Sequence, residues 1–578
     1  MRCFYTPADT HAYTKQTNFD RKQVDRNTLL AFLLISLVLI FTPFYMDLVN
    51  PKPETEKFEE QIDTPPPNPT ENTTKKQTET EVLEKTTKLK TEEESFFTLE
   101  TDLYEVVISN KNGGSIVSFK LFEYLTHDSF YVNLINELNK NNLSIDLRSI
   151  NGEDIDLTGP WFLKQKPTVQ AIKEVTTLVF FTNSALGRIE KSLTFFPGSY
   201  AVQVDINTEA VSSSVFANQY LFSWKGGLPP TEKNETDDLL YTNSFLFQGG
   251  ELEKIKADGP NYLKVDYNGL TDWVSTRTKY FTASFIPNKN TQPKSAVVGS
   301  QKKGGAEIYD LSLVLSASTP SSILLYLGPL EYERIKSLTP TLGEIMSFGW
   351  GPIKPISKGV LWTLKKMRTF IPNYGFILIL FAITVKFLVY PLTKKSYEST
   401  QAMQRLAPEI NKLKEKYKNN PQKLNQATMQ MYKDRGVNPL GGCLPMLLQM
   451  PLLFALFVVF RSTIELRAEP FVFWIRDLSS PDVIFTLPFS IPIYGDGVAV
   501  LPILMGLSMF VQQKMMSGGV AQQPQQKMMQ YFMSVFFFLL FNQFPSGLNL
   551  YYTLFNVLTI VQQKVSPQKT FSPGKTTS

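Results

Sequence analysis

One lysine lies inside an otherwise uncharged apolar stretch. Residues 374–391 are long enough to enter a bilayer, and Lys386 is their only charged residue. A lysine at the centre of a membrane helix costs roughly 2.5–3.5 kcal/mol on an insertion scale, so it is kept for a water-filled cavity or a partner charge. The rival interpretation is a snorkelling side chain, because a helix ending at Leu392 leaves about 9 Å between Lys386 and that end.

Further polar side chains interrupt the apolar segments. Polar groups within a membrane tend to face the helix bundle interior or water. A wet groove would shorten the apolar barrier that a polar loop must cross, and a cation in it would attract acidic residues of a passing chain. The polar residues concerned are Thr384, Gln449, Gln512, Gln513, Asn549 and Asn556.

Metal and nucleotide chemistry have little support in the sequence. There are two cysteines, Cys3 and Cys443, and two histidines, His11 and His127, with no CxxC or HExxH pattern and no GxxxxGK[ST] loop. The net charge of +5 is small for 578 residues. We therefore expect no catalytic residues, no cofactor, no metal site and no DNA partner.

The first 95 residues divide into three parts. A polar leader, 1–27, has no evident role and ends in a basic flank that includes Arg26. The apolar run 28–46 follows without a small-x-small cleavage site, so we expect an uncleaved anchor with its N-terminus in the cytoplasm. Residues 51–95 hold 12 acidic residues, 7 basic residues and 10 threonines, which is typical of a disordered linker.

Residues 96–335 predict a large β-sandwich-like domain. Short β-branched and aromatic runs recur between turn signals, as in 103–109 and 115–121 on either side of 110–114. After an anchor with a cytoplasmic N-terminus, this domain lies outside the cytoplasm. The aromatic and basic segment 338–370 predicts an amphipathic element in the membrane interface, with a plain linker helix as the alternative.

Five further apolar segments follow, several of them shorter than a usual span of about 20 residues. Between the first two, the loop 394–440 carries ten basic and four acidic residues, a net charge of +6 that places it in the cytoplasm. The tail 565–578 is then cytoplasmic too. The turn 544–547 joins the last two spans at the outer face, with Asn542 and Gln543 expected to meet water. The five segments are 373–392, 441–460, 499–516, 529–544 and 547–564.

The basic loop predicts a helical hairpin with an apolar seam. Its apolar residues step by 3 and 4, and Gly436 ends the pattern. Its lysines fit a solvated face that contacts lipid headgroups, or a surface that docks on ribosomal RNA. The seam consists of Met403, Leu406, Ile410, Leu413 and Tyr417, then Leu424, Thr428 and Met431.

Several strings resemble the YidC/Oxa/Alb family of membrane-protein insertases, in the family's order and spacing. The resemblance is close over 345–564, and the anchor, linker and β-domain are similar to the long form of bacteria with two membranes. The strings include Asn373-Tyr-Gly-Phe376, Tyr390-Pro-Leu-Thr-Lys394, Val437-Asn-Pro-Leu-Gly-Gly-Cys-Leu-Pro445, Trp474-Ile-Arg-Asp-Leu-Ser479, Leu501-Pro-Ile-Leu-Met-Gly506 and Phe544-Pro-Ser-Gly-Leu548 with Tyr551-Tyr552.

The resemblance implies a non-enzymatic insertase and chaperone in the bacterial inner membrane. It would insert nascent membrane proteins, alone or with the Sec translocon, through a hydrophilic groove open to the cytoplasm. Lys386 matches the family's groove cation, which is usually arginine, so the planar guanidinium is lost here. The expected groove and client-binding residues are Lys386, Thr384, Gln449, Gln512, Asn549, Tyr551, Tyr552 and Asn556.

The fold class expected is a multi-domain membrane protein with six transmembrane α-helices. These are the anchor and a five-helix core over 373–564, joined to the β-sandwich and the cytoplasmic hairpin. Partners would be nascent membrane proteins, the Sec translocon, the lipid bilayer and, through the hairpin, the ribosome. Two other classes stay open from the residues alone: a transporter that uses Lys386 as a counter-charge, and a scaffold whose β-domain does the binding.

Overall fold

The computed structural model describes residues 92–165, 171–257, 260–303, 306–418, 420–437, 444–492, 494–517 and 524–565. The leader 1–27, the anchor 28–46, most of the linker 51–95 and the tail beyond Val565 lie outside the described residues.

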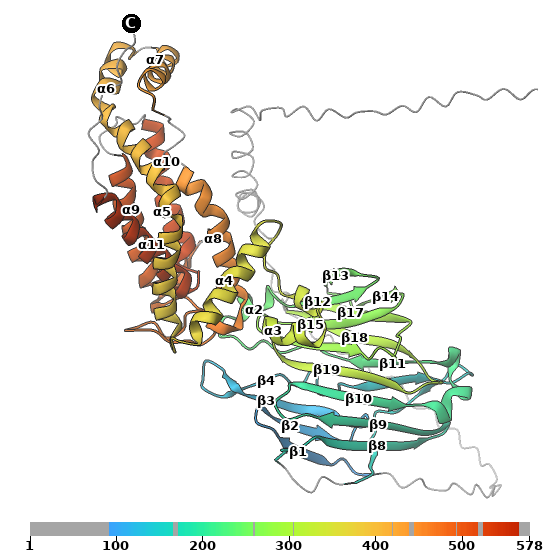
Figure 1. Ribbon diagram of the computed structural model, residues 1–578. Helices are drawn as coiled ribbons and strands as arrows, with labels where there is room; N and C mark the ends of the chain where they lie inside the picture. Colours follow the sequence, from blue (N-terminus) through green and yellow to red (C-terminus); the bar gives the residue numbers. More distant parts are fainter. Residues whose placement is uncertain are drawn as a thin grey trace, which may run out of the picture. The chain divides into compact units, whose positions relative to one another are not determined.

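The β-rich domain contains three antiparallel sheets (Figure 1). A four-stranded sheet has the order β1 (Phe96–Glu100), β2 (Tyr104–Ser109), β3 (Ser115–Leu125), β4 (Tyr131–Asn133). A nine-stranded sheet has the order β13 (Glu251–Ile255), β12 (Asn243–Gln248), β15 (Thr271–Arg277), β16 (Phe281–Pro287), β19 (Ser321–Pro329), β10 (Ala201–Asn207), β9 (Gly187–Phe195), β8 (Thr176–Ser184), β7 (Phe162–Leu163). A six-stranded sheet has the order β14 (Leu263–Asn268), β17 (Ser295–Lys303), β18 (Ala306–Ser316), β11 (Gln219–Trp224), β5 (Ser144–Arg148), β6 (Asp154–Ile155).

The core of this domain lies between sheets, as the alternating sequence predicts. In β9 every second residue from Ile189 to Phe195 is buried. Phe222 of the six-stranded sheet meets Phe285 of the nine-stranded sheet with ring centroids 4.8 Å apart. The predicted turn 110–114 is confirmed: Gly113 has φ +68°, and a Cβ there would lie 2.6 Å from the Trp161 ring.

The remaining described elements are mostly helical. Two strands, β20 (Val483–Ile491) and β21 (Gly495–Ala499), form a hairpin between α8 and α9. The 3-10 helices are Glu209–Ser214, Phe216–Asn218, Leu342–Ile345 and Ile464–Leu466. The α-helices are α2 (Glu235–Leu239), α3 (Tyr332–Leu338), α4 (Ile353–Arg368), α5 (Tyr374–Arg405), α6 (Ala407–Lys416), α7 (Pro421–Asp434), α8 (Leu444–Ser462), α9 (Val500–Ser517), α10 (Pro524–Phe541) and α11 (Ser546–Val565).

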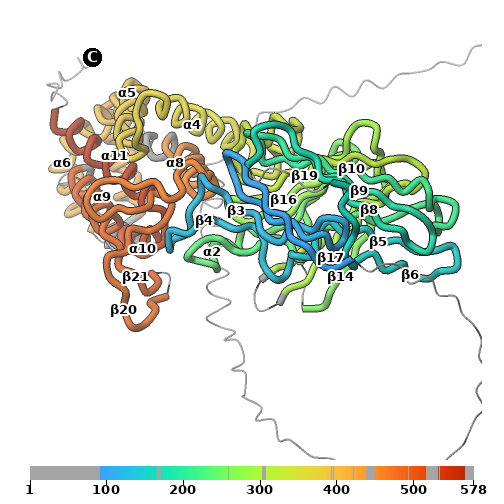
Figure 2. Tube along the Cα trace, turned by 90° about the horizontal axis from the view of Figure 1, so that it is seen from below, coloured from blue at the N-terminus to red at the C-terminus, as the bar shows by residue number. Residues whose placement is uncertain are grey.

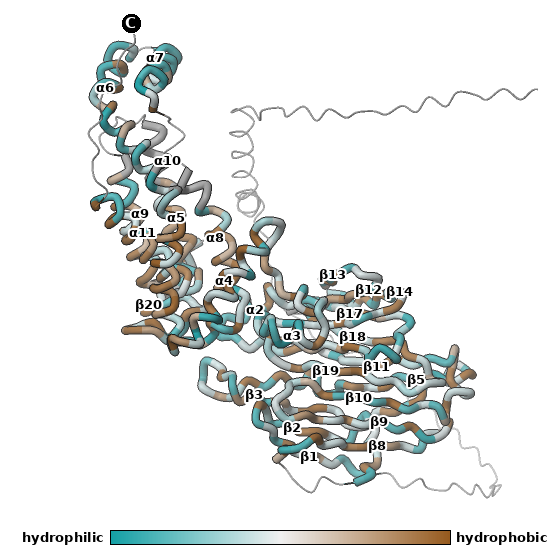
Figure 3. Tube along the Cα trace, in the orientation of Figure 1, coloured by the Kyte–Doolittle hydropathy of each residue, from teal (hydrophilic) through white to brown (hydrophobic). Residues whose placement is uncertain are grey.

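The helical core is apolar over most of its length and polar at α6 and α7 (Figure 3). α11 packs against α5 and α9, α10 packs against α9, and α4 packs against α8. Each of the five predicted apolar segments overlaps one helix; in chain order these helices are α5, α8, α9, α10 and α11. By length and composition, one described segment, Tyr374–Pro391, is long and apolar enough to cross a membrane. The number of six spans therefore stays a prediction.

Helix α5 is longer than expected. The sequence suggested an end near Leu392, but α5 continues through Pro391 to Arg405, over 32 residues. A proline inside a helix removes one backbone hydrogen bond, and the other bonds and the packing on α11 evidently outweigh that loss. The first part of the basic loop therefore belongs to the same helix as Lys386.

Candidate functional site

The start of α5 is fixed by Asn373 and Gly375. The Asn373 Oδ1 accepts hydrogen bonds from the backbone N–H groups of Gly375, at 2.9 Å, and Phe376, at 3.4 Å, which caps the helix. Its Nδ2 donates to the Pro470 carbonyl at 2.9 Å. A Cβ on Gly375 would lie 1.9 Å from the ring of Phe471, so only glycine permits this contact.

Lys386 lies three turns into α5 and its side chain is directed at α11. Its Nζ donates a hydrogen bond to Thr559 Oγ1 at 2.7 Å and lies 4.6 Å from the centre of the Phe555 ring. The Thr559 hydroxyl donates its own proton to the Phe555 carbonyl, so its oxygen is free to accept from the lysine. Among the described residues, Lys386 has no carboxylate within ion-pair distance.

This geometry bears on the snorkelling interpretation. The estimate of about 9 Å assumed that the helix ends at Leu392, whereas α5 ends at Arg405. The ammonium group reaches the neighbouring helix, where a neutral hydroxyl and an aromatic face receive it, and it also lies 6.0 Å from the centre of the Tyr397 ring, further along α5. The cation is thus half-buried, with its charge uncompensated by any described residue.

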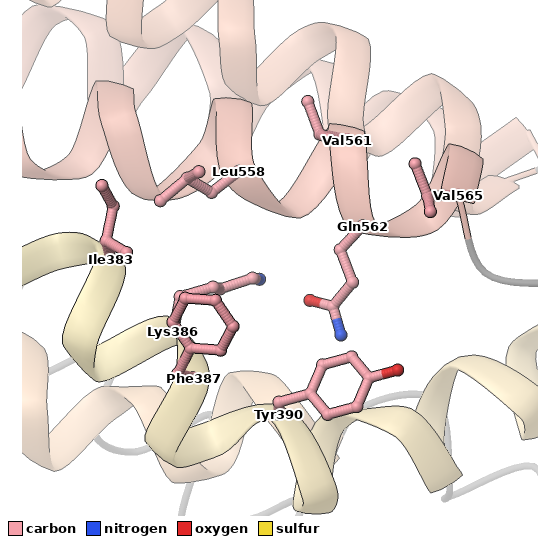
Figure 4. Close-up of a pocket in the computed structure, with 8 residues that line it drawn as sticks. All are labelled: Ile383, Lys386, Phe387, Tyr390, Leu558, Val561, Gln562 and Val565. Carbon is pink, nitrogen blue, oxygen red and sulfur yellow. The ribbon is translucent and has the colours of Figure 1, made fainter.

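The lysine lines a pocket of about 450 Å³ between α5 and α11 (Figure 4). Its walls are mostly apolar, and Lys386 and Gln562 supply polar atoms from opposite helices. Such a pocket can hold an apolar segment while offering one positive charge to an acidic group. The lining residues are Ile383, Lys386, Phe387 and Tyr390 of α5, and Leu558, Val561, Gln562 and Val565 of α11.

A second, more polar pocket lies further along α5. Tyr397 lines it, and the Tyr397 ring is also 6.0 Å from the Lys386 Nζ, so this side chain lies close to both pockets. The Gln404 Nε2 donates to the Met515 carbonyl at 3.0 Å, which ties α5 to α9 here. The other lining residues are Thr400, Gln401, Gln404, Arg405, Met515 and Gln563.

Of the eight expected groove residues, only Lys386 lines either pocket. Thr384 is exposed and its hydroxyl donates to the Leu380 carbonyl of its own helix. Gln449 and Gln512 are half-buried outside both pockets. Asn549 is fully buried, and its Nδ2 donates to the carbonyls of Phe541 and Phe544 at 3.0 and 3.3 Å, so it holds the turn between α10 and α11.

Three other expected residues of α11 are buried among the helices. Asn556 donates to Ser508 Oγ of α9 at 3.1 Å. Tyr551 and Tyr552 are buried, and within the described part of the chain their hydroxyls have no hydrogen-bond partner. These polar atoms lie inside the bundle, as intramembrane polar groups should, but not on a pocket wall.

Thr559, Gln562 and Gln563 were not anticipated from the sequence. A detectable signal does exist: polar or amphipathic residues of α11 recur at steps of 3 and 4, which places them on one helical face. If the polar residues on this face of α11 are taken together, they include Thr559, the hydrogen-bond partner of Lys386. The stripe is Asn549, Tyr552, Asn556, Thr559 and Gln563.

Asn542 does not meet water, which corrects the expectation for the turn at the end of α10. It is buried, with 2% of its surface exposed. Its Oδ1 accepts from Ala499 N at 3.1 Å, and its Nδ2 donates to the carbonyls of Tyr494 and Gly497 at 2.8 and 2.6 Å. The side chain therefore satisfies the backbone of a β-hairpin that the sequence did not reveal; Gln543 is exposed as expected.

The end of α8 near Ser462 is tied to the β-rich domain by ion pairs. Arg461 and Lys279 both contact the Asp237 carboxylate, at 2.5 and 2.8 Å. Burial opposes ionisation of Asp237, but these two cations outweigh it and lower the pKa of its carboxyl. Arg467 pairs with Glu232 at 2.7 Å, with both side chains mostly buried. This end of the helical core thus faces the domain.

The basic hairpin is built from α6 and α7. Leu406 and Ile410 are buried with Val437, and Met403 and Met431 pack against them. Arg435 donates to both oxygens of Glu409 at 3.0 Å, which links the two helices. Leu413 and Leu424 of the predicted seam are only half-buried and lie outside this cluster. The apolar seam is therefore confirmed at its α5 end only.

Two family models match the chain. The one described as "60Kd inner membrane protein" matches residues 366–572, and the one described as "YidC periplasmic domain" matches residues 97–363. Together they cover most of the chain, including both pockets.

Curated relatives are similar over nearly their whole length. The "Membrane protein insertase YidC" of Chlorobaculum parvum is 34% identical over 564 residues, covering 93% of this chain and 94% of the relative. That of Chlorobium luteolum is 37% identical over 479 residues, covering 80% and 81%. A solved structure described as an active YidC insertase with its first transmembrane domain resolved is 18% identical, with a TM-score of 0.36, covering 83% of this chain and 94% of that one.

Proposed function

This chain belongs to the YidC family of membrane protein insertases, and from that premise we propose that it receives its clients at the pocket between α5 and α11. It is a non-enzymatic inner-membrane protein with a periplasmic domain, and it binds nascent membrane proteins. The observation that carries the proposal is the Lys386 charge, which pairs with no described carboxylate, on a mostly apolar pocket wall.

The pocket offers what an incoming membrane segment needs. Its apolar side chains from two helices can contact an apolar segment, and such contacts are non-directional, so they do not require one client sequence. Lys386 adds an attractive site for an acidic residue at the edge of that segment, because a carboxylate is drawn to a cation most strongly where little water screens it. The more polar pocket near Tyr397 would accommodate the hydrophilic residues that precede the segment.

Photo-crosslinking can test this assignment with a matched pair of valines on α11. Val561 lines the pocket; Val557 lies one turn earlier, is similarly exposed and does not line it. With p-benzoylphenylalanine at either site, we expect a ribosome-stalled nascent chain with one membrane segment to crosslink several-fold more from position 561. Equal yields from the two positions would place the client elsewhere on the core.

The topology proposed has both termini in the cytoplasm and six spans. It is supported by the ion pairs between the α8 end and the periplasmic domain, and by the basic α6–α7 hairpin beyond the opposite end of α5. In a variant without Cys3 and Cys443, we expect single cysteines at Glu60 and Asn420 to react with a membrane-impermeant maleimide from opposite sides. Labelling of both from one side would exclude this topology.

Two further partners are proposed on the family resemblance. The Sec translocon would share clients with this chain, and the ribosome would meet the lysines of α6 and α7, most of which are solvent-exposed. Co-purification of translating ribosomes with the full chain, compared with a variant in which Lys412, Lys414 and Lys416 are glutamine, tests the second. Unchanged recovery of ribosomes would indicate that these lysines contact lipid headgroups and not the ribosome.

A further inference from the structure

The β20–β21 hairpin between α8 and α9 exposes several large apolar side chains. Val483, Ile484 and Phe485 are consecutive and 43%, 60% and 58% exposed, and Phe489 is 61% exposed. β20 is exposed along nearly its whole length, and its register with β21 is irregular between Val483 and Phe485. No charged residue occurs from Val483 to Tyr494. A strand that covers the protein's own core buries one of its faces, whereas no residue of β20 is buried.

The root of the hairpin is held firmly to the helical core. The Asp482 Oδ2 accepts from the backbone N–H groups of Val500 and Leu501 at 3.2 and 2.8 Å and from Trp474 Nε1 at 2.8 Å. On the other side, the Asn542 side chain holds the backbone of β21, as described above. The exposed strand is therefore a fixed projection, not a loose loop, and it leaves the core beside α9 and α10 (Figure 2).

We propose that this hairpin lies in the periplasmic leaflet of the membrane, at the boundary between lipid headgroups and acyl chains. The chain is an inner-membrane protein, and the α8 end that leads to the hairpin is paired with its periplasmic domain. The apolar surface of the hairpin continues onto α9, where Ile503, Leu504 and Leu507 are also exposed. Lipid is therefore the occupant expected to cover this continuous apolar surface.

The backbone of the hairpin favours lipid over another protein strand. Pro488 interrupts β20 and Pro492 follows it, and the β20–β21 register is irregular both between Val483 and Phe485 and between Thr486 and Ile491. Proline cannot donate to an added strand, so this edge is a poor template for pairing with a client or a second copy. An isolated two-stranded hairpin is marginally stable in water, so its exposed apolar side chains need a cover.

The same physics limits the depth of insertion. Unpaired backbone groups at an open strand edge are not tolerated in the hydrocarbon interior, so the hairpin must remain where headgroups and water reach its edge. Trp474 lies at its root, and Tyr494 lies in the connection between the two strands, against Phe538 of α10. Such aromatic side chains with one polar end are enriched at membrane interfaces. The hairpin thus anchors the outer end of α9 at the level of the headgroups.

The test uses the full-length protein, without Cys3 and Cys443, in vesicles of 3:1 phosphatidylethanolamine and phosphatidylglycerol. An NBD fluorophore is placed at Ser490→Cys, an exposed small residue of the hairpin, and at Asn151→Cys, an exposed control in the periplasmic domain. We expect lipids with a nitroxide at acyl carbon 5 to quench the Ser490 probe at least threefold more than nitroxides at carbon 12, and the Asn151 probe to be quenched only by aqueous iodide.

A second variant separates the hairpin's own affinity from that of the probe. With Ile484, Phe485 and Phe489 replaced by serine, the same probe at position 490 should lose most of its lipid quenching, while crosslinking of a client at Val561 is retained. Iodide quenching of the Ser490 probe equal to that of Asn151 would overturn the proposal. Unchanged lipid quenching in the serine variant, or crosslinking of position 490 to a client or a second copy in place of lipid quenching, would overturn it as well.

Discussion

Replacing Lys386 with alanine is expected to reduce insertion of clients with acidic outer tails by about tenfold, whereas arginine should preserve it and glutamate should be worst. A tenfold loss corresponds to about 1.4 kcal/mol. The attraction between two opposite unit charges 4 Å apart near a protein surface is roughly 4 kcal/mol, which is more than enough to account for such a loss. Clients with neutral tails should be much less affected, because they lose no attraction. The measurement is client insertion and complementation at matched protein levels.

Thr559 supplies the control that distinguishes a functional charge from a structural contact. Thr559→Val removes the hydroxyl that accepts from Lys386 at 2.7 Å but leaves the charge in the pocket. If the charge acts on clients, this variant should retain at least half of the insertion of acidic clients. If Thr559→Val and Lys386→Ala are equally defective for every client, the pair serves only to hold α5 against α11.

The second large effect is expected from the hairpin formed by α6 and α7. Ile410→Asp places a charge in the small cluster of Leu406, Val437 and Met403, where burial of an unpaired charge costs several kcal/mol. The two helices should separate, and complementation should fall by about tenfold or more while the helices of the core still integrate into the membrane.

Leu413→Asp is the matched control, because Leu413 lies on the same helix but outside that cluster and is only half-buried. We expect its activity to stay within about twofold of the unaltered protein. The two variants are compared by growth complementation and by protease protection of the core. Full activity of the Ile410→Asp variant would show that the packing of this hairpin is not required for insertion.

The sequence was most informative where one physical rule dominates. Period-two burial in strands such as β9 and the glycine turn at 113–114 follow from local geometry, and both are in the structure. The cation at Lys386 was also identified from sequence alone, because a single charge in an apolar run is so costly. Its acceptor was not, since Thr559 is 173 residues away in the chain.

Polar residues in apolar segments were harder to assign. The sequence shows that the side-chain amides of Asn542 and Asn549 need hydrogen-bond partners, but it does not identify those partners. The Nδ2 of Asn549 donates to the carbonyls of Phe541 and Phe544, while its Oδ1 has no hydrogen-bond partner among the described residues. Asn542 bonds to a hairpin more than forty residues earlier. That hairpin gave no strand signal, because β20 lacks the alternation of apolar and polar residues by which a half-buried strand is detected.

The unbroken course of α5 has a mechanical consequence. At 1.5 Å per residue its 32 residues form a rod about 48 Å long, with the Asn373 cap at one end and the Leu406 cluster at the other. A tilt of about 10° around the cap would sweep the far end sideways by roughly 8 Å. Lys386 is about 18 Å from the cap and would move by only about 3 Å. A large displacement of the basic hairpin therefore corresponds to a small displacement of Lys386. The helix would bend most easily at Pro391, where one backbone hydrogen bond is missing.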